Sequence, residues 1–382
     1  MSSGKAKPSL LHIHSEFGEG IAAARCVQLI NAFGAKFEHS LVSADAVQSS
    51  AAQNIKRTAK VSMLTGFPAL SGMPTPGRLQ KLARAMQGYD LILTYGWGAM
   101  DTVMAHTLFG EVHGLPPLVH HEDGFCEDER ARRKKRRNWY RKIAFGKASG
   151  LVVPNEALEE IALVEWEQPI GRVKRIDPGV DTKAYAKKAK ADALPRLLKR
   201  PGEHWVGAMA SDADSAHLAA LVRAVAALPD NWHLVLVGDV SGRAEVMAEA
   251  DAQQINHRVH LPGEVDEICK ILSLFDIFAD AAGGKRNDAA STTALVEAMA
   301  AGLPVAIASA DSVLSQDNAD FLAPFAYDET LADALAALAF DEGLRGMIGK
   351  ANQKEAQAKY DATMMAKTYL RLYSSALDRS GR

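Results

Sequence analysis

The segment Glu297–Val305 reads EAMAAGLPV. Its first half continues a helical pattern that begins near Ser291. Gly302 and Pro304 predict the end of that helix, because glycine is a common C-cap and proline cannot continue a helix. The apolar residues Pro304–Ile307 then predict a strand. A helix that leads directly into a buried strand indicates an α/β domain with a parallel sheet.

Short apolar runs alternate with helical patterns on both sides of this segment, in two series. The predicted strands of the first series are Leu10–His14, His39–Ser43, Asp90–Thr94, Pro117–His121 and Leu151–Pro154. Those of the second series are Trp205–Met209, His233–Val237, Val259–Leu261, Ile277–Ala279 and Pro304–Ile307. The predicted helices between them include Ile21–Phe33, Leu79–Gln87 and Ser215–Leu228. This alternation predicts two parallel sheets with helices on both faces.

The 382 residues suffice for two domains of ordinary size. A polar stretch with seven basic residues, Lys183–Glu203, separates the two series. We therefore predict a first domain at residues 1–182, a linker at 183–203 and a second domain at 204–362. The last helical stretch has no strand after it, so we expect residues 363–382 to cross back and pack on the first domain.

Composition excludes several classes of protein. A formal net charge of −2 argues against a nucleic-acid-binding protein, which needs a broad basic surface. The cysteines Cys26, Cys126 and Cys269 match no metal-binding spacing, which predicts reduced thiols in a reducing compartment. The apolar run Leu10–Ile13 is too short for a signal peptide, and no stretch reaches the roughly 20 apolar residues that span a bilayer. We expect a cytoplasmic protein.

Loops after strands are where doubly wound folds bind ligands, and the first such loop carries Gly18 and Gly20 before a helix. Glycine lets a ligand approach the backbone, and a helix N-terminus favours an anion. A tight turn is the alternative, because Ala23 replaces the third glycine of a dinucleotide-binding pattern.

His120 and His121 end a predicted strand and lead into a loop that holds Glu122 and Asp123. A histidine at the carboxyl end of a strand can donate hydrogen bonds or transfer protons near neutral pH. Neighbouring side chains of a strand point in opposite directions, so at most one of the two should face a ligand. The alternatives are a histidine bonded to loop backbone and a zinc site that includes Cys126, for which the spacing is not standard.

Nine Lys and Arg residues lie in the stretch Arg130–Lys142, together with Trp139 and Tyr140. Acidic residues precede this stretch, and such an order suits a helix dipole. A solvated helix face is the usual meaning of a charge run. The density of charge and the aromatic neighbours also fit an anionic membrane surface or a lipid-diphosphate acceptor.

A second glycine-containing loop, with Gly283, Gly284, Lys285 and Arg286, follows a strand of the second series. A loop of this kind before a helix suits a phosphate or a sugar. Glu297 on the following helix offers a carboxylate for the two hydroxyls of a ribose, and we expect it at the N-terminal end of that helix. The alternatives are an exposed helical glutamate and two exposed loop cations.

The segment at residues 297–305 resembles the nucleotide-sugar signature of family 4 glycosyltransferases. Three further segments resemble family motifs in the same order: DPGVDT at 177–182, HLVLVGD at 233–239 and RVHLPG at 258–263. The resemblance spans residues 10–375 and implies the GT-B fold, with two Rossmann-like domains facing a cleft. It also implies retaining transfer of a sugar from a UDP- or GDP-sugar, without a bound metal or cofactor.

By motif match, the resemblance places Glu297 at the donor ribose and the loop of Gly18 and Gly20 at the diphosphate. It places His120 or His121 near the donor sugar. These roles come from the family and are expectations for this chain.

The family pattern is incomplete here. A glutamate of the family, eight positions before Glu297, is replaced by Ala289. The arginine and lysine that neutralise the diphosphate are replaced by Ala208 and Ala213. The neighbouring loop of Lys285 and Arg286 is a candidate source of the missing charge.

Two functions follow as hypotheses. The first is a glycosyltransferase of polysaccharide or glycolipid synthesis, which takes a nucleotide sugar and a glycan or lipid-linked acceptor at the inner face of the membrane. The second is a catalytically impaired GT-B protein that acts as a binding or scaffolding partner.

Overall fold

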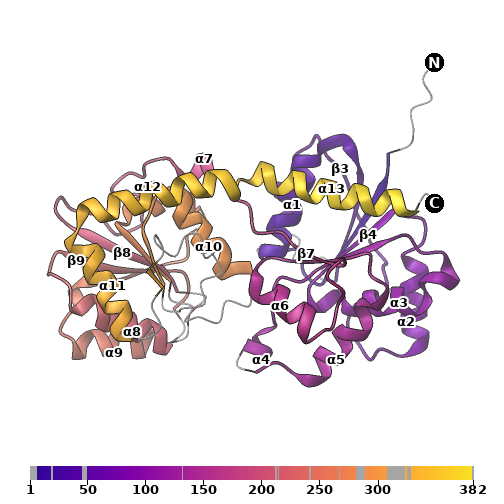
Figure 1. Ribbon diagram of the computed structural model, residues 1–382, viewed down its shortest axis with the longest axis horizontal. Helices are drawn as coiled ribbons and strands as arrows, with labels where there is room; N and C mark the ends of the chain where they lie inside the picture. Colours follow the sequence, from indigo (N-terminus) through magenta and orange to yellow (C-terminus); the bar gives the residue numbers. More distant parts are fainter. Residues whose placement is uncertain are drawn as a thin grey trace, which may run out of the picture. The chain divides into compact units, whose positions relative to one another are not determined.

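The computed structural model describes residues 7–18, 20–44, 50–130, 132–210, 213, 215–240, 242–265, 267–280, 289–307, 323–324 and 328–380. The chain forms two compact units (Figure 1): unit 1 runs to Asp177 and resumes at Thr363, and unit 2 takes most of the chain between them. Residues 183–203, which we predicted as a linker, lie in unit 2. Leu194 is buried there in the same apolar cluster as Trp205.

In the described part of unit 1, seven parallel strands form one sheet in the order β3-β2-β1-β4-β5-β6-β7. The strands are Ser9–His14 (β1), Glu38–Ser43 (β2), Lys60–Met63 (β3), Leu91–Tyr95 (β4), Leu118–His121 (β5), Gly150–Val153 (β6) and Val173–Arg175 (β7). All five strands predicted for this series are confirmed to within one residue at each end. The other two, β3 and β7, are short and mostly exposed, so they lack the apolar run of a buried strand.

Helices cover both faces of this sheet. They are Ile21–Phe33 (α1), Pro76–Ala85 (α2), Met100–His113 (α3), Glu127–Arg130 (α4), Lys135–Ala144 (α5), Glu156–Val164 (α6) and Ala362–Ser380 (α13). Short 3₁₀ turns occupy Gly34–Lys36, Ser50–Asn54, Trp97–Ala99 and Phe145–Lys147. The start of α2 is fixed by Thr75, whose hydroxyl accepts a hydrogen bond from the Arg78 N–H. The long α13 packs on the α1 side of the sheet (Figure 1). Its Tyr369 and Tyr373 are fully buried there.

In the described part of unit 2, six parallel strands form a second sheet in the order β10-β9-β8-β11-β12-β13. The strands are His204–Met209 (β8), Trp232–Val237 (β9), Val259–Gly263 (β10), Ile277–Asp280 (β11), Val305–Ile307 (β12) and Ala323–Pro324 (β13). The helices are Thr182–Tyr185 (α7), Ser215–Ala226 (α8), Arg243–Ala252 (α9), Ala289–Ala300 (α10), Asp328–Phe340 (α11) and Glu342–Lys359 (α12), with 3₁₀ turns at Asn256–Arg258, Ile268–Lys270 and Leu272–Leu274. The five predicted strands are confirmed, and β13, with two residues, was not predicted.

Both sheets follow the doubly wound pattern, in which the first strand of the unit lies beside the fourth and the order reverses between them. This confirms the predicted α/β class with two Rossmann-like sheets. Ligands of such folds bind outside the carboxyl ends of the strands at the reversal point. These points lie between β1 and β4 in unit 1, and between β8 and β11 in unit 2. Within the described residues, no helix has the length and apolar character needed to cross a membrane.

Candidate functional site

The loop after β1 runs from Ser15 past Gly18 to Gly20, which is the N-cap of α1. Gly20 has an ordinary extended backbone, and a Cβ there would meet no atom within 4 Å. Among the described residues, no side chain caps α1 by a hydrogen bond, and its first turn holds no acid. This helix end therefore suits an anion. A role for Gly18 and Gly20 at a diphosphate stays a prediction.

His120 and His121 project to opposite sides of β5, and both are fully buried. On the α13 side, His121 Nε2 lies 2.8 Å from the Tyr373 hydroxyl, and His121 Nδ1 lies 3.1 Å from the Thr94 carbonyl oxygen. On the other side, His120 Nδ1 lies 2.8 Å from Thr94 Oγ1, and the ring packs on Phe145. Protein groups thus hold both rings, and a catalytic role for either histidine stays a prediction.

Three more histidines, His12, His14 and His39, are buried near His121. His12 Nε2 lies 2.9 Å from His39 Nδ1, while His14 and His121 both stack on Tyr95. Burial lowers the pKa of His14 to about 3 and that of His39 to about 4. It also lowers the pKa of His12 and His121 well below the usual value. These histidines are neutral at neutral pH and form a polar part of the core.

Cys126, an alternative zinc ligand in the sequence, lies close to Asp128 and Glu129, with ligand atoms of the three residues within 4.8 Å of one another. Both carboxylates accept hydrogen bonds from Arg137. These two acids of α4 therefore pair with arginine, which competes with the binding of a metal ion.

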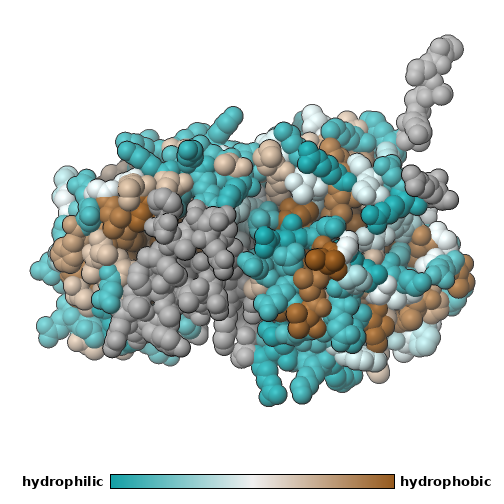
Figure 2. Space-filling view, viewed as in Figure 1, coloured by the Kyte–Doolittle hydropathy of each residue, from teal (hydrophilic) through white to brown (hydrophobic). Residues whose placement is uncertain are grey.

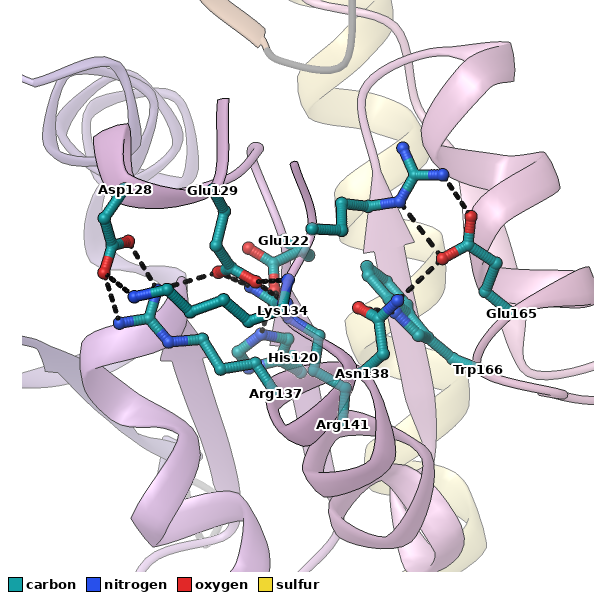
Figure 3. A network of polar contacts seen from close by, with 11 residues as sticks. His120, Glu122, Asp128, Glu129, Lys134, Arg137, Asn138, Arg141, Glu165 and Trp166 are labelled. Carbon is teal, nitrogen blue, oxygen red and sulfur yellow. Dashed lines mark hydrogen bonds and ion pairs between the residues drawn. The ribbon is translucent and has the colours of Figure 1, made fainter. Parts of the chain in front are cut away.

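An ion-pair network holds the segment between β5 and α5 (Figure 3). Arg141 is fully buried, and its guanidinium lies 3.2 Å from both Glu122 and Glu129. Burial alone would raise the pKa of Glu129, but hydrogen bonds from Arg141 and Arg137 lower it below its usual range. His120 Nε2 lies 3.9 Å from the Glu122 carboxylate. Because an unpaired buried charge is costly, this network fixes the loop that follows the two histidines.

The basic stretch Arg130–Lys142 is not one helix, since α4 ends at Arg130 and α5 begins at Lys135. Several of its cations are paired within unit 1: Arg133 with Glu165, Lys134 and Arg137 with Asp128, and Lys142 with Glu167. Lys135 and Arg136 are exposed, as is 65% of Trp139. The surface over α4 and α5 is mainly hydrophilic (Figure 2). Fewer cations are therefore available to an outside partner than the sequence indicates.

A pocket of about 560 Å³ opens on unit 1 beside this network. Ser15, which follows β1, and Trp97 and Gly98, which follow β4, form part of its wall, so the pocket lies at the reversal point of the sheet. A Cβ on Gly98 would overlap the Ser15 side chain, so only glycine lets the two loops approach this closely. The segment between α4 and α5 and the start of α5 contribute Lys134, Arg136 and Arg137 to the lining.

In unit 2, Glu297 is the ninth of the 12 residues of α10, so the prediction that it lies at the N-terminal end of the helix is wrong. The helix begins at Ala289, before the start expected from the sequence. The Glu297 side chain is partly exposed, and its carboxylate accepts a hydrogen bond from the Tyr185 hydroxyl. Burial and the neighbouring Glu297 raise the pKa of Tyr185, which keeps this donor protonated. Tyr185 falls in the stretch that we predicted as a linker, so the sequence did not point to it.

Four of the predicted donor-binding residues lie outside the described part of the chain: Gly283, Gly284, Lys285 and Arg286. Ala208 and Ala213, which occupy the positions of the family's arginine and lysine, are buried in the core of unit 2. An arginine at position 208 would place a charge among apolar side chains, so the missing cations cannot be restored there without disturbing the core.

Comparison with known proteins gives a family match for part of the chain and a fold for the whole of it. Residues 203–341 match the family model described as Glycosyl transferases group 1. No curated protein matches the chain in sequence. The Anabaena Alr3699/HepE structure in complex with UDP has a TM-score of 0.74 at 19% identity, covering 97% of this chain and 100% of that chain.

Two further structures are similar over their whole length. A glycosyltransferase from Rickettsia africae has a TM-score of 0.74 at 12% identity, covering 98% of this chain and 99% of that chain. Sucrose-phosphate synthase from Thermosynechococcus elongatus has a TM-score of 0.71 at 19% identity, covering 98% of this chain and 100% of that chain. At these identities the similarity establishes the fold, and it extends over both units.

Proposed function

For a chain that has the GT-B fold and whose second unit matches glycosyl transferases group 1, we propose transfer of a sugar from a nucleotide diphosphate sugar to a glycan or glycolipid acceptor. Unit 2 binds the donor, and unit 1 binds the acceptor. Transfer proceeds with retention, as the resemblance to family 4 implies. The observation that carries the proposal is the Glu297 carboxylate, which is partly exposed and lies inside the segment that matches the family.

Glu297 suits the donor ribose because a carboxylate offers about four lone-pair sites. The Tyr185 hydroxyl uses one of them. Ribose hydroxyls are hydrogen-bond donors and match such an acceptor. A structure with the same fold was determined with UDP, which supports a UDP-sugar as donor; a GDP-sugar is the other donor that the resemblance implies.

Negative charge develops on the leaving diphosphate during transfer, and cations or helix N-termini stabilise it. We assign this role to Lys285 and Arg286, which follow β11 in the sequence. Strand β11 itself borders the reversal point of the second sheet. In unit 1, the N-terminus of α1 with Gly18 and Gly20 is assigned to an anionic group of the substrate. His120 or His121 acts near the donor sugar in this proposal, and no metal or cofactor takes part.

A second candidate is a GT-B protein without transferase activity that binds or scaffolds a partner. The burial of Ala208 and Ala213 favours it, because a transferase of this family places cations at these positions. The two candidates differ in one property: the transferase must bind a nucleotide sugar and cleave its sugar–phosphate bond.

We also propose that the protein binds to the cytoplasmic face of a membrane. The exposed group Lys135, Arg136 and Trp139 supports it, because basic side chains attract anionic lipid and an exposed tryptophan suits the headgroup region.

Calorimetry and thermal shift with UDP, GDP, ADP and their sugars test the function. A ligand that binds only the folded chain raises its stability by mass action, by about 2.7 kcal/mol at 100 times its dissociation constant. The transferase proposal requires that the protein bind a UDP- or GDP-sugar. It also requires that the bound nucleotide sugar be cleaved slowly, with release of UDP or GDP. If none of these nucleotides or nucleotide sugars binds, both the proposed enzyme activity and the assignment of the donor are rejected.

A further inference from the structure

The pocket of unit 1 points to the chemistry of the acceptor. We propose that it binds a sugar acceptor that carries an anionic group, either a phosphate or a carboxylate. This inference rests on the proposed transferase function, since it names the substrate that unit 1 receives. Its position supports a ligand site, because the loops after β1 and β4 form the wall where doubly wound sheets bind ligands.

The charge of the lining favours an anion. Three cations, Lys134, Arg136 and Arg137, line the pocket. Asp128 pairs with both Lys134 and Arg137, and Glu129 also pairs with Arg137; neither acid belongs to the lining. Arg136 is exposed and forms no ion pair within the described part of the chain, so its positive charge is available to a ligand.

Asp101, the acid of the lining, does not reverse this charge. Its Oδ2 pairs with Arg78, and its Oδ1 accepts a hydrogen bond of 2.6 Å from the Tyr140 hydroxyl. Burial and the bond to Asp101 raise the pKa of Tyr140, so this hydroxyl stays protonated. Asp101 is thereby neutralised and oriented, and a carboxylate held in this way can still accept a hydrogen bond from a sugar hydroxyl.

Recognition by charge also fits the packing of Trp97, one of the two aromatic residues of the lining. The ring centre of Trp97 lies 4.8 Å from the guanidinium carbons of both Arg137 and Arg141. Two cations therefore already pack on this ring, which leaves it less able to stack on a neutral sugar. The volume of about 560 Å³ falls in the range of small-molecule sites, so the pocket suits a sugar with one charged substituent.

The test is calorimetric titration of the full chain with glucose 6-phosphate, glucuronate, inorganic phosphate and glucose. Both charged sugars, or one of them, should bind more tightly than glucose and inorganic phosphate; the sugar that binds identifies the phosphate or the carboxylate as the recognised group. Arg136→Gln should weaken that binding by about tenfold or more, the scale of a lost hydrogen bond between charged groups. Arg84→Gln, which removes an exposed arginine on α2 outside the lining, should leave it unchanged.

Ser71→Trp provides a second variant, because Ser71 is an exposed residue of the lining and an indole there should block the pocket. Three results would each overturn the proposal. They are equal affinity for glucose and the charged sugars, failure of both charged sugars to bind, and an Arg136→Gln variant that binds like the parent chain. UDP binding is measured on the same samples. If UDP binds and the charged sugars do not, the acceptor inference fails alone; if UDP, GDP and their sugars all fail to bind, the proposed function fails.

Discussion

The Tyr185 hydroxyl donates a hydrogen bond to the carboxylate of Glu297, which lies 112 positions further along the chain. Tyr185 closes the short helix α7, and Glu297 lies in the last turns of α10. The bond fixes the direction of a carboxylate that is otherwise partly exposed. A carboxylate whose direction is fixed before the ligand arrives loses less entropy on binding.

We expect Glu297→Ala to weaken binding of UDP or GDP by about 1–3 kcal/mol, because a hydrogen bond to a charged group is lost. Titration calorimetry measures the change. Tyr185→Phe removes only the orienting hydroxyl and should produce a smaller loss. A 2′-deoxynucleotide separates the effects, since the parent chain should discriminate against it and the Glu297 variant should not. Equal affinity of the Glu297→Ala variant and the parent chain would contradict the ribose role.

We expect the double change Lys285→Ala and Arg286→Ala to reduce the rate of sugar transfer by about 100- to 1,000-fold, the effect of removing one group that stabilises transition-state charge. Turnover of the nucleotide sugar measures the rate, and circular dichroism confirms the fold. Arg84→Ala is the matched control for loss of a surface cation. A double variant that retains full turnover would show that other groups stabilise the diphosphate.

Arg141→Ala should lower the free energy of unfolding by about 3–5 kcal/mol, because it leaves the buried Glu122 without its cation and leaves the buried Glu129 with Arg137 alone. Urea denaturation followed by circular dichroism measures it. Arg84→Ala, at an exposed position, should change stability by no more than about 0.5 kcal/mol. Similar values for the two variants would mean that the network of Figure 3 does not hold the loop.

The buried histidines predict a loss of stability in mild acid. Their pKa values are lowered in the folded chain, to about 3 for His14 and about 4 for His39, so the unfolded chain binds more protons below pH 6.5. The free energy of unfolding should therefore fall as the pH drops from about 6.5 toward 4, by up to about 1.4 kcal/mol per pH unit for each such histidine. Urea denaturation between pH 7 and pH 5 measures the slope.

His14→Phe tests the origin of that slope. The His14 ring stacks on Tyr95, and its Nε2 has no hydrogen-bond partner among the described residues, so phenylalanine keeps the packing and removes the titrating group. The variant should lose stability less steeply with falling pH than the parent chain. An unchanged slope would assign the acid sensitivity to other groups.

The exposed surface of α5 should bind vesicles that contain anionic lipid, and salt should weaken the binding by screening. Co-sedimentation at low and high salt measures it. Lys135→Glu with Trp139→Ala should reduce binding, whereas Arg84→Glu should have little effect. Equal binding to neutral and anionic vesicles, or no binding to either, would remove the membrane proposal.

The fold class was accessible from the sequence because strands of a doubly wound sheet are buried on both faces. They therefore appear as apolar runs, such as Leu91–Tyr95. Predicting such a strand needs no information from distant residues. Helix α1 was predicted with its observed bounds because its apolar spacing and the glycine after Phe33 are local signals. The position of Glu297 in the chain, and its match to a family signature, were likewise visible without a structure.

The roles of charged side chains were decided by tertiary structure. In the sequence, Arg137 and Arg141 belong to a basic run that indicates a solvated face. In the fold, Glu129 of α4 pairs with both arginines, and Arg141 is fully buried. Tyr185 was hidden in the same way, inside the polar stretch that we predicted as a linker.

The physical reason lies in the range of each interaction. Helix and strand formation depend on apolar periodicity and caps within about 18 residues, so one sequence segment is enough to predict them. The environment of a charge depends on which distant groups the folded chain brings within a few ångströms. The same lysine or arginine is solvated on an isolated helix and buried when a carboxylate from another part of the chain pairs with it. Only the tertiary structure of this chain selects between these two environments.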